Sequence, residues 1–273
     1  MHTLEGKRVL ITGAAAGIGR SMARAFAAQG AHLLLTDLDE AHLTEAADEL
    51  VAAGRQAWAY PLDVTDADQI AALRDAVHEQ GGPIDVLVNN AGVVFGGAFL
   101  DVPIEAHITT LRVNTLGPIM LTHAFLPDLI SREDAHLVNI ASAAGYLPVP
   151  LMTTYAASKW AALGFSESIQ AELVELGHRH VHVTAVCPGY VSTGMFEGAT
   201  APLLTPWLTP DQIADKVVEA VLHNRTHVRE PFMVKTIPAL KGLLPETGFN
   251  AITQMLGLHS GMREWHGPSG DSR

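Results

Sequence analysis

The sequence predicts an α/β fold in which one parallel sheet is covered by helices on both faces. Short apolar runs rich in β-branched residues alternate along the chain with longer, alanine-rich amphipathic segments. Alternation of this length is typical of strand–helix–strand units, whose right-handed crossovers build a parallel sheet. The runs are almost entirely apolar, as expected of strands that are buried on both faces.

The predicted strands follow one another in chain order, and all but the last are strongly apolar. The stronger runs are "RVLITG", "AHLLLTD", "AWAYPLD", "IDVLVNN", "AHLVNIAS" and "HVTAVCPG", and a weaker run, "REPFMV", comes late. The helices between them are predicted to begin near Gly17, Asp39, Asp66, Ile104 and Thr153.

Domain organisation follows from where the composition changes. No linker is visible before about Thr226, so residues 1–273 are predicted to form a single domain with a core over about 5–234. The last part, about 235–273, holds Pro238, Pro245 and several glycines. We expect it to form a C-terminal extension with one or two short helices.

Composition excludes several classes of partner. The 273 residues include 17 basic and 29 acidic side chains, and the resulting net charge of −12 argues against nucleic acid and against anionic membrane surfaces. No uninterrupted apolar run approaches the length of about 18 residues that a membrane span needs, so we expect no stable membrane insertion. No signal peptide is visible, and Cys187 is the only cysteine, which favours a cytoplasmic location.

A glycine loop, "TGAAAGIGR", joins the first predicted strand to the first helix. Glycines at Gly13, Gly17 and Gly19 let backbone N–H groups approach a pyrophosphate, and the helix N-terminus adds a partial positive charge. A tight strand–helix turn would also favour glycine, but the position in the chain favours a dinucleotide site. Ala16 and Ile18 complete the loop residues expected against the cofactor.

The end of the second strand predicts the choice of cofactor. Asp37 can accept hydrogen bonds from the adenosine ribose and would repel a 2′-phosphate, which favours NAD over NADP. The sequence has no Lys or Arg within the glycine loop before Arg20 or directly after Asp37. The alternative role of Asp37 is a helix N-cap, for which Asp39 is better placed. Leu38 is expected beside the adenosine, and Asp63 and Val64 beside the adenine edge.

Tyr155 and Lys159, in "TTYAASKWAALGF", lie four residues apart on one predicted helix face. A free tyrosine has a pKa of about 10, and a base near neutral pH needs a pKa lower by roughly 3 units, equivalent to about 4 kcal/mol. A nearby ammonium supplies part of that shift. The alternative is a surface Tyr–Lys packing pair.

Further motifs decide between these alternatives. "NNAG" (Asn89 to Gly92), Asn114 in "LRVNTLGP", Ser142 in "VNIASAAG" and "CPGYVST" (Cys187 to Thr193) occur in this order with Tyr155 and Lys159. The set resembles the short-chain dehydrogenase/reductase family from about Lys7 to Val234. The resemblance implies a Rossmann-type, doubly wound parallel sheet of about seven strands and an NAD-dependent oxidoreductase acting on CH–OH groups.

The resemblance also implies residue roles. Tyr155 would be the general acid–base, Lys159 would lower its pKa and bind the nicotinamide ribose, and Ser142 would hold the substrate oxygen. Asn114 would interrupt its helix and hold a water that links Lys159 to solvent. The remaining residues expected to contact the cofactor are Asn90, Ala91, Gly92, Pro188, Gly189, Val191 and Thr193. Family members often pair the helices around Ile104–Ser131 and Thr153–Gly177, so we expect a homodimer or homotetramer.

The substrate is expected to be an uncharged, bulky, hydrophobic secondary alcohol or ketone. By resemblance, its pocket is bounded by the segment after Ser142, by Tyr190 and by the loop 194–210, where Glu197 is the only charged residue and Asp211 follows directly. The predicted pocket residues are Ala144, Tyr146, Tyr190, Met195 and Phe196. The segment Leu240 to Leu258 is a candidate cover. An NADP-dependent ketone reductase, a silent cofactor-binding sensor or scaffold, and a dehydratase or epimerase relative stay open.

No metal is predicted. His178, His180 and His182 occur at every second position. A zinc site is one interpretation of this spacing, and the start of an ordinary strand, which we favour, is the other. Cys187 is expected to be a small core residue and not a reactive thiol.

Overall fold

A computed structural model describes residues 1–202, 205–255, 257, 261, 262, 265 and 267. In this part of the chain the strands form one sheet in the order β3-β2-β1-β4-β5-β6-β7, with every pair parallel. The strands are β1 (Arg8–Thr12), β2 (His32–Asp37), β3 (Ala57–Pro61), β4 (Val86–Asn89), β5 (Ala135–Ile140), β6 (Val181–Pro188) and β7 (His227–Glu230). The predicted fold class is confirmed.

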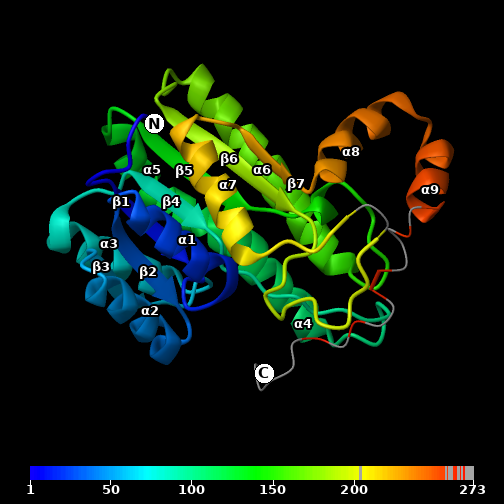
Figure 1. The fold of residues 1–273 in the computed structure, drawn as a ribbon, viewed down its shortest axis with the longest axis horizontal. Helices are drawn as coiled ribbons and strands as arrows, with labels where there is room; N and C mark the ends of the chain where they lie inside the picture. The colour runs from blue at the N-terminus through cyan, green and yellow to red at the C-terminus, as the bar shows by residue number, and fades with distance from the viewer. Residues whose placement is uncertain (203–204, 256, 258–260, 263–264, 266, 268–273) are drawn as a thin grey trace.

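Helices cover both faces of this sheet (Figure 1). Those packed on one face are α1 (Gly17–Ala28), α2 (Glu40–Ala52) and α7 (Pro210–Leu222). Those packed on the other are α3 (Ala67–Gly81), α5 (Gly117–Ser131) and α6 (Thr153–Glu175). The remaining elements are α4 (Ile104–Leu111), the π-helical turn η1 (Arg112–Leu116), the 3₁₀ turn η2 (Ala143–Gly145), α8 (Phe232–Leu243) and α9 (Glu246–Met255).

Strand β1 shows why the apolar runs are continuous. Val9 and Ile11 belong to the core on the α1 side, whereas Leu10 between them belongs to the core on the α3 side. Successive side chains of a strand point to opposite faces, so a strand buried on both faces needs apolar residues at every position.

The predicted helix starts agree with the structure, and local side-chain caps set two of them, those of α2 and α3. Asp39 accepts a hydrogen bond from the His42 N–H and caps α2, and Asp66 caps α3. Helix α7 was not among the predicted starts. Its signal was present, because Thr209 and Gln212 form a reciprocal capping box around Pro210.

The C-terminal part differs in detail from its prediction. The weak strand was placed too late: β7 occupies His227–Glu230, and Phe232 already begins α8. The predicted boundary at 234 therefore falls inside α8, whose Val234 and Ile237 are buried in a cluster with Cys187. Helices α8 and α9 project beside β7 (Figure 1). Among the described residues, no helix is long and apolar enough to cross a membrane.

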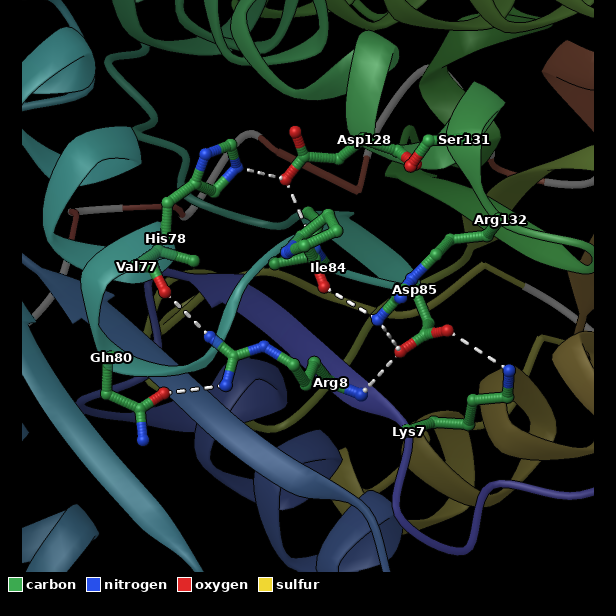
Figure 2. A network of polar contacts seen from close by, with 11 residues as sticks. Lys7, Arg8, Val77, His78, Gln80, Ile84, Asp85, Asp128, Ser131 and Arg132 are labelled. Atoms are coloured by element: carbon green, nitrogen blue, oxygen red, sulfur yellow. Dashed lines mark hydrogen bonds and ion pairs between the residues drawn. The ribbon is translucent and has the colours of Figure 1, made fainter.

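A polar network holds the amino ends of β1 and β4 together (Figure 2). The buried Asp85 carboxylate accepts from the Arg8 backbone N–H at 3.0 Å and pairs with the Lys7 ammonium at 3.0 Å and the Arg132 guanidinium at 3.1 Å. Asp128 accepts from the Ile84 N–H at 3.1 Å. Asp85 thus fixes β1 against the start of β4, and Asp128 ties α5 to Ile84, the residue before Asp85, at the edge of the sheet opposite to the cleft described next.

Candidate active site

A cleft lies at the carboxyl ends of the strands, around the junction of β1 with β4. Chain connections leave these two strands in opposite directions, which is the position where ligands bind in open α/β sheets. Residues predicted to contact cofactor or substrate that line the cleft are Gly13, Ala16, Gly17, Ile18, Asp37, Leu38, Asp63, Val64, Asn90, Ala91, Gly92, Ser142, Tyr155, Lys159, Pro188, Gly189, Val191, Thr193, Met195 and Phe196.

The glycine loop is built by close backbone packing. Gly19 does not line the cleft, but a Cβ there would lie 1.9 Å from the Gly13 carbonyl oxygen, so the loop closes only with glycine. The Asn90 amide donates to the carbonyls of Thr12 at 2.9 Å and Gly13 at 3.0 Å. Asn90 therefore ties the end of β4 to the start of the loop.

Asp37 ends β2 at one end of the cleft. Its carboxylate accepts from the Ala15 N–H at 3.0 Å and from the Asp39 N–H at 3.1 Å. Arg20, at the start of α1, pairs with Glu45 at 2.8 Å and Glu49 at 2.9 Å. The cation nearest the loop in sequence is therefore already bound to two carboxylates.

Helix α6 presents Tyr155 and Lys159 into the cleft. Both side chains are buried, and the Lys159 Nζ lies 5.6 Å from the centre of the Tyr155 ring. The ammonium donates to the Ile140 carbonyl at 2.9 Å, and the phenol is hydrogen bonded to the Ser142 side chain. Ser142 is the N-cap of η2, two residues after the end of β5, and its hydroxyl accepts from the Ala144 N–H at 3.1 Å. The structure thus brings the predicted serine, tyrosine and lysine together.

The electrostatics of the pair are dominated by burial. Burial raises the pKa of Tyr155 to about 12, and the hydrogen bond with Ser142 opposes that rise. Burial also lowers the pKa of Lys159 to about 8. Loss of hydration disfavours the charged form of each group, the phenolate of Tyr155 and the ammonium of Lys159.

Asn114 lies behind this pair in the π-helical turn η1. Its side-chain oxygen accepts from the Val93 N–H at 2.8 Å, and its amide donates to the Val93 carbonyl at 2.9 Å and to the Ser158 hydroxyl at 3.1 Å. Asn114 does not line the main cleft; it borders a small cavity between α5 and α6 that Lys159 also borders. The helix is interrupted there, as the resemblance implied.

An apolar cluster surrounds the phenol of Tyr155. Ala144 belongs to its buried part, and Tyr190, Met195 and Phe196 pack against it. The rings of Tyr155 and Phe196 meet edge to face with centroids 5.9 Å apart. Four of the predicted pocket residues therefore gather beside the phenol.

Tyr146 is a correction to the predicted pocket. It is buried in the neighbouring cluster with Leu147 and Cys187, and its hydroxyl accepts from the Arg229 guanidinium at 2.9 Å. The side chain belongs there because a buried phenol needs a polar partner, which β7 supplies. Leu240 and Leu244 pack against the same cluster, so the described part of the expected cover does not lie over Tyr155; Leu258 is outside the described residues.

Sequence reasoning missed two groups of residues near the cleft. The first group consists of apolar residues that line the cleft: Leu62, Val93, Val113, Ile140 and Ala141. The second is Met262, which is buried in the cluster around Tyr155. No local pattern marked either group.

The alternating histidines His178, His180 and His182 lie around the start of β6. His178 and His180 precede β6, and His182 faces His136 across the β5–β6 pair with ring centres 6.0 Å apart. Over the described ranges, no group of three or more His, Cys, Asp or Glu side chains is arranged to hold a metal ion.

Comparison with known proteins agrees with this geometry. The family model for short chain dehydrogenases matches residues 7–203. The chain belongs to this family. One relative is epidermal retinol dehydrogenase 2 of Mus musculus. It is 38% identical to this chain over 247 residues, which cover 88% of this chain and 79% of the relative. Estradiol 17-beta-dehydrogenase 11 of Mus musculus is 33% identical, covering 89% of this chain and 82% of the relative.

Solved short-chain dehydrogenases share the fold. One from Burkholderia phymatum in complex with NAD superposes with a TM-score of 0.81 at 30% identity, covering 89% of this chain and 95% of that chain. A metagenomic short-chain oxidoreductase in complex with NADP superposes with a TM-score of 0.70 at 34% identity, covering 82% and 95%. Oxidoreductase chemistry with a nicotinamide dinucleotide is thus common to these neighbours, and both dinucleotides occur among them.

Proposed function

We propose that this protein is an NAD-dependent dehydrogenase that oxidises bulky, uncharged, apolar secondary alcohols and reduces the matching ketones. The observation that carries the proposal is the convergence of Ser142, Tyr155 and Lys159 between the cleft that the glycine loop lines and an apolar cluster. The glycine loop, Asn90 and Asp37 are the chain's own groups for holding the dinucleotide along that cleft.

The chemistry follows from the side chains. The Ser142 hydroxyl and the Tyr155 phenolate hold the alcohol oxygen between them. As the carbonyl forms, the hydroxyl proton moves to the Tyr155 Oη, and the carbinol carbon loses hydride. The bound nicotinamide supplies the hydride acceptor for oxidation and the hydride donor for reduction. Lys159 favours the phenolate electrostatically, and the cavity that it shares with Asn114 gives the proton a route away.

The substrate class rests on the lining beside Tyr155. Met195, Phe196 and Tyr190 offer apolar and aromatic contacts, and the cleft lining contains no arginine to clamp an anionic group. Retinol and estradiol, which name two of the relatives, are both bulky apolar alcohols, and this favours the same class here.

A side-by-side kinetic assay tests the proposal. With NAD⁺, kcat/KM for cyclohexanol and for a fused-ring alcohol such as 2-decalol is expected to exceed that for sorbitol or lactate by about tenfold or more, because only the apolar alcohols bury surface against this lining. A preference for the polyol or for the hydroxy acid would overturn the substrate class and leave the reaction class intact.

Cofactor preference is tested at Asp37. Asp37→Asn keeps an oxygen for the Ala15 N–H but removes the charge that repels a 2′-phosphate, so the NADP⁺-to-NAD⁺ ratio of kcat/KM is expected to rise by about tenfold. The matched control is Asp39→Asn. It also removes one carboxylate charge, but two residues further along the chain, at the N-cap of α2. An unchanged ratio in Asp37→Asn, or better use of NADP⁺ by the natural protein, would contradict the NAD assignment.

We also propose that the protein assembles as a homodimer or homotetramer through α4 and α5. Ile104, Ile108, Leu111 and Ile119 are exposed on this helical surface, and burying them in a subunit contact would be favourable. Sedimentation velocity measures the assembly directly.

A further inference from the structure

We infer that Met262 and Trp265, close to the C-terminus, form the outer wall of the alcohol pocket and determine which apolar alcohols fit. The inference rests on the proposed function, since it names residues that select the substrate of that same site. Neither residue was expected there from the sequence, which favoured the segment Leu240 to Leu258 as a cover.

Met262 packs into the cluster that surrounds the catalytic phenol. Its exposed fraction is 6%, and its buried neighbours in that cluster include Tyr155, Ala144 and Met152. A thioether side chain is flexible and polarizable, so it adapts to apolar ligands of irregular shape. An alcohol whose oxygen lies at Tyr155 therefore has its carbon skeleton among the same apolar side chains that Met262 contacts.

Trp265 joins the two loops at the mouth of the cleft. Its indole N–H donates to the Met195 carbonyl at 3.1 Å, in the loop after β6. Its ring also faces Gly96, in the loop after β4, where an added Cβ would lie 2.9 Å from the ring. Trp265 therefore connects the loop after β4 to the loop after β6, and each of these loops contributes a residue to the cleft lining, Val93 and Met195.

Gly261 fixes this part of the chain against the loop after β6. Its carbonyl accepts from the Thr200 N–H at 2.8 Å, and a Cβ on Gly261 would lie 2.6 Å from the Tyr190 Oη. Figure 1 shows the red C-terminal residues beside the yellow segment that follows β6. The wall is thus held by backbone hydrogen bonds and by close contact, in addition to apolar packing.

The chemistry of the wall selects by size and polarity. A methionine and an indole present no formal charge. Met262 belongs to the apolar cluster around Tyr155, and Trp265 packs against that cluster, as Phe196 and Tyr190 also do. We therefore expect a second ring of a fused-ring alcohol to contact this wall, whereas a single-ring alcohol contacts it less.

The test compares 2-decalol with cyclohexanol, both with NAD⁺. In Met262→Ala and Trp265→Ala, the 2-decalol-to-cyclohexanol ratio of kcat/KM is expected to fall at least about fivefold, because each substitution removes apolar surface against which the second ring packs. Trp265→Phe keeps a ring but removes the N–H donor, and a smaller fall is expected. Met255→Ala, an exposed methionine on α9, is the matched control with an unchanged ratio.

A ratio in Met262→Ala and Trp265→Ala that stays within twofold of wild type, or that rises, would overturn the inference. A second measurement separates this from failure of the proposed function. The protein loaded with NADH cannot oxidise an alcohol, so calorimetric binding of 2-decalol to it reports on the pocket alone. If no alcohol is oxidised but Met262→Ala still weakens that binding at least fivefold, the inference about the pocket wall is supported and the proposed reaction is contradicted. If binding is unaffected, the inference about the wall is contradicted as well.

Discussion

Tyr155→Phe is expected to lower kcat for alcohol oxidation by a factor of at least about 10² while NADH binding survives. The substitution keeps the ring, and hence its edge contact with Phe196, but removes the oxygen that we propose accepts the substrate proton. Single-turnover kinetics with NAD⁺ and titration with NADH measure the two quantities separately.

The matched control for this result is Tyr146→Phe. It removes the same hydroxyl from a buried tyrosine that contacts Arg229 outside the cleft, so turnover is expected to stay within a few-fold of wild type. A Tyr155→Phe variant that retains more than a fifth of wild-type kcat would remove Tyr155 from proton transfer.

Lys159→Met is expected to reduce the rate of alcohol oxidation at neutral pH by about tenfold or more. It should also shift the rise of the rate with pH to higher pH values. Burial raises the pKa of Tyr155 to about 12, so a phenolate near neutral pH depends on nearby positive charge, and the ammonium is one source. Burial lowers the pKa of Lys159 to about 8, so its own charge is lost as pH rises through that value. The difference between wild type and variant should therefore shrink above about pH 8.

Kinetic pH profiles from pH 6 to 10 provide the measurement. Lys241→Met is the matched control, because that ammonium lies over the Trp160 ring, outside the cleft lining, at 3.8 Å from the ring centre. An alkaline limb that coincides in Lys159→Met and wild type would exclude Lys159 from control of the phenol.

Features set by neighbouring residues were predictable from the sequence. The caps at Asp39 and Asp66 and the glycine loop each depend on residues within one turn of the chain, so the starts of α2, α3 and α1 were placed correctly. The order of motifs also predicted that Ser142 would meet Tyr155 and Lys159. Parallel strands end at the same edge of a sheet, which brings these segments together without further information.

Features set by distant residues were not predictable in the same way. Tyr146 follows Ser142 closely in sequence, yet its hydroxyl goes to Arg229, 83 residues away. Met262 joins the cluster around Tyr155 from more than a hundred residues away, and nothing in its local sequence specifies that position. The burial that raises the pKa of Tyr155 to about 12 likewise depends on the whole assembled core.

The π-helical turn at 112–116 lies between α4 and α5 and changes the rotation of one helix about its axis relative to the other. Each residue of an α-helix turns the chain by about 100°, so deletion of one residue from this turn would join α4 and α5 into a regular helix and rotate one against the other by that angle. His107 of α4 contacts the Thr154 hydroxyl at 2.6 Å, whereas Phe125 of α5 is buried under the sheet, and a regular helix could satisfy only one of these positions. The extra residue thus acts as a spacer that lets one continuous segment contact α6 and pack in the core at once.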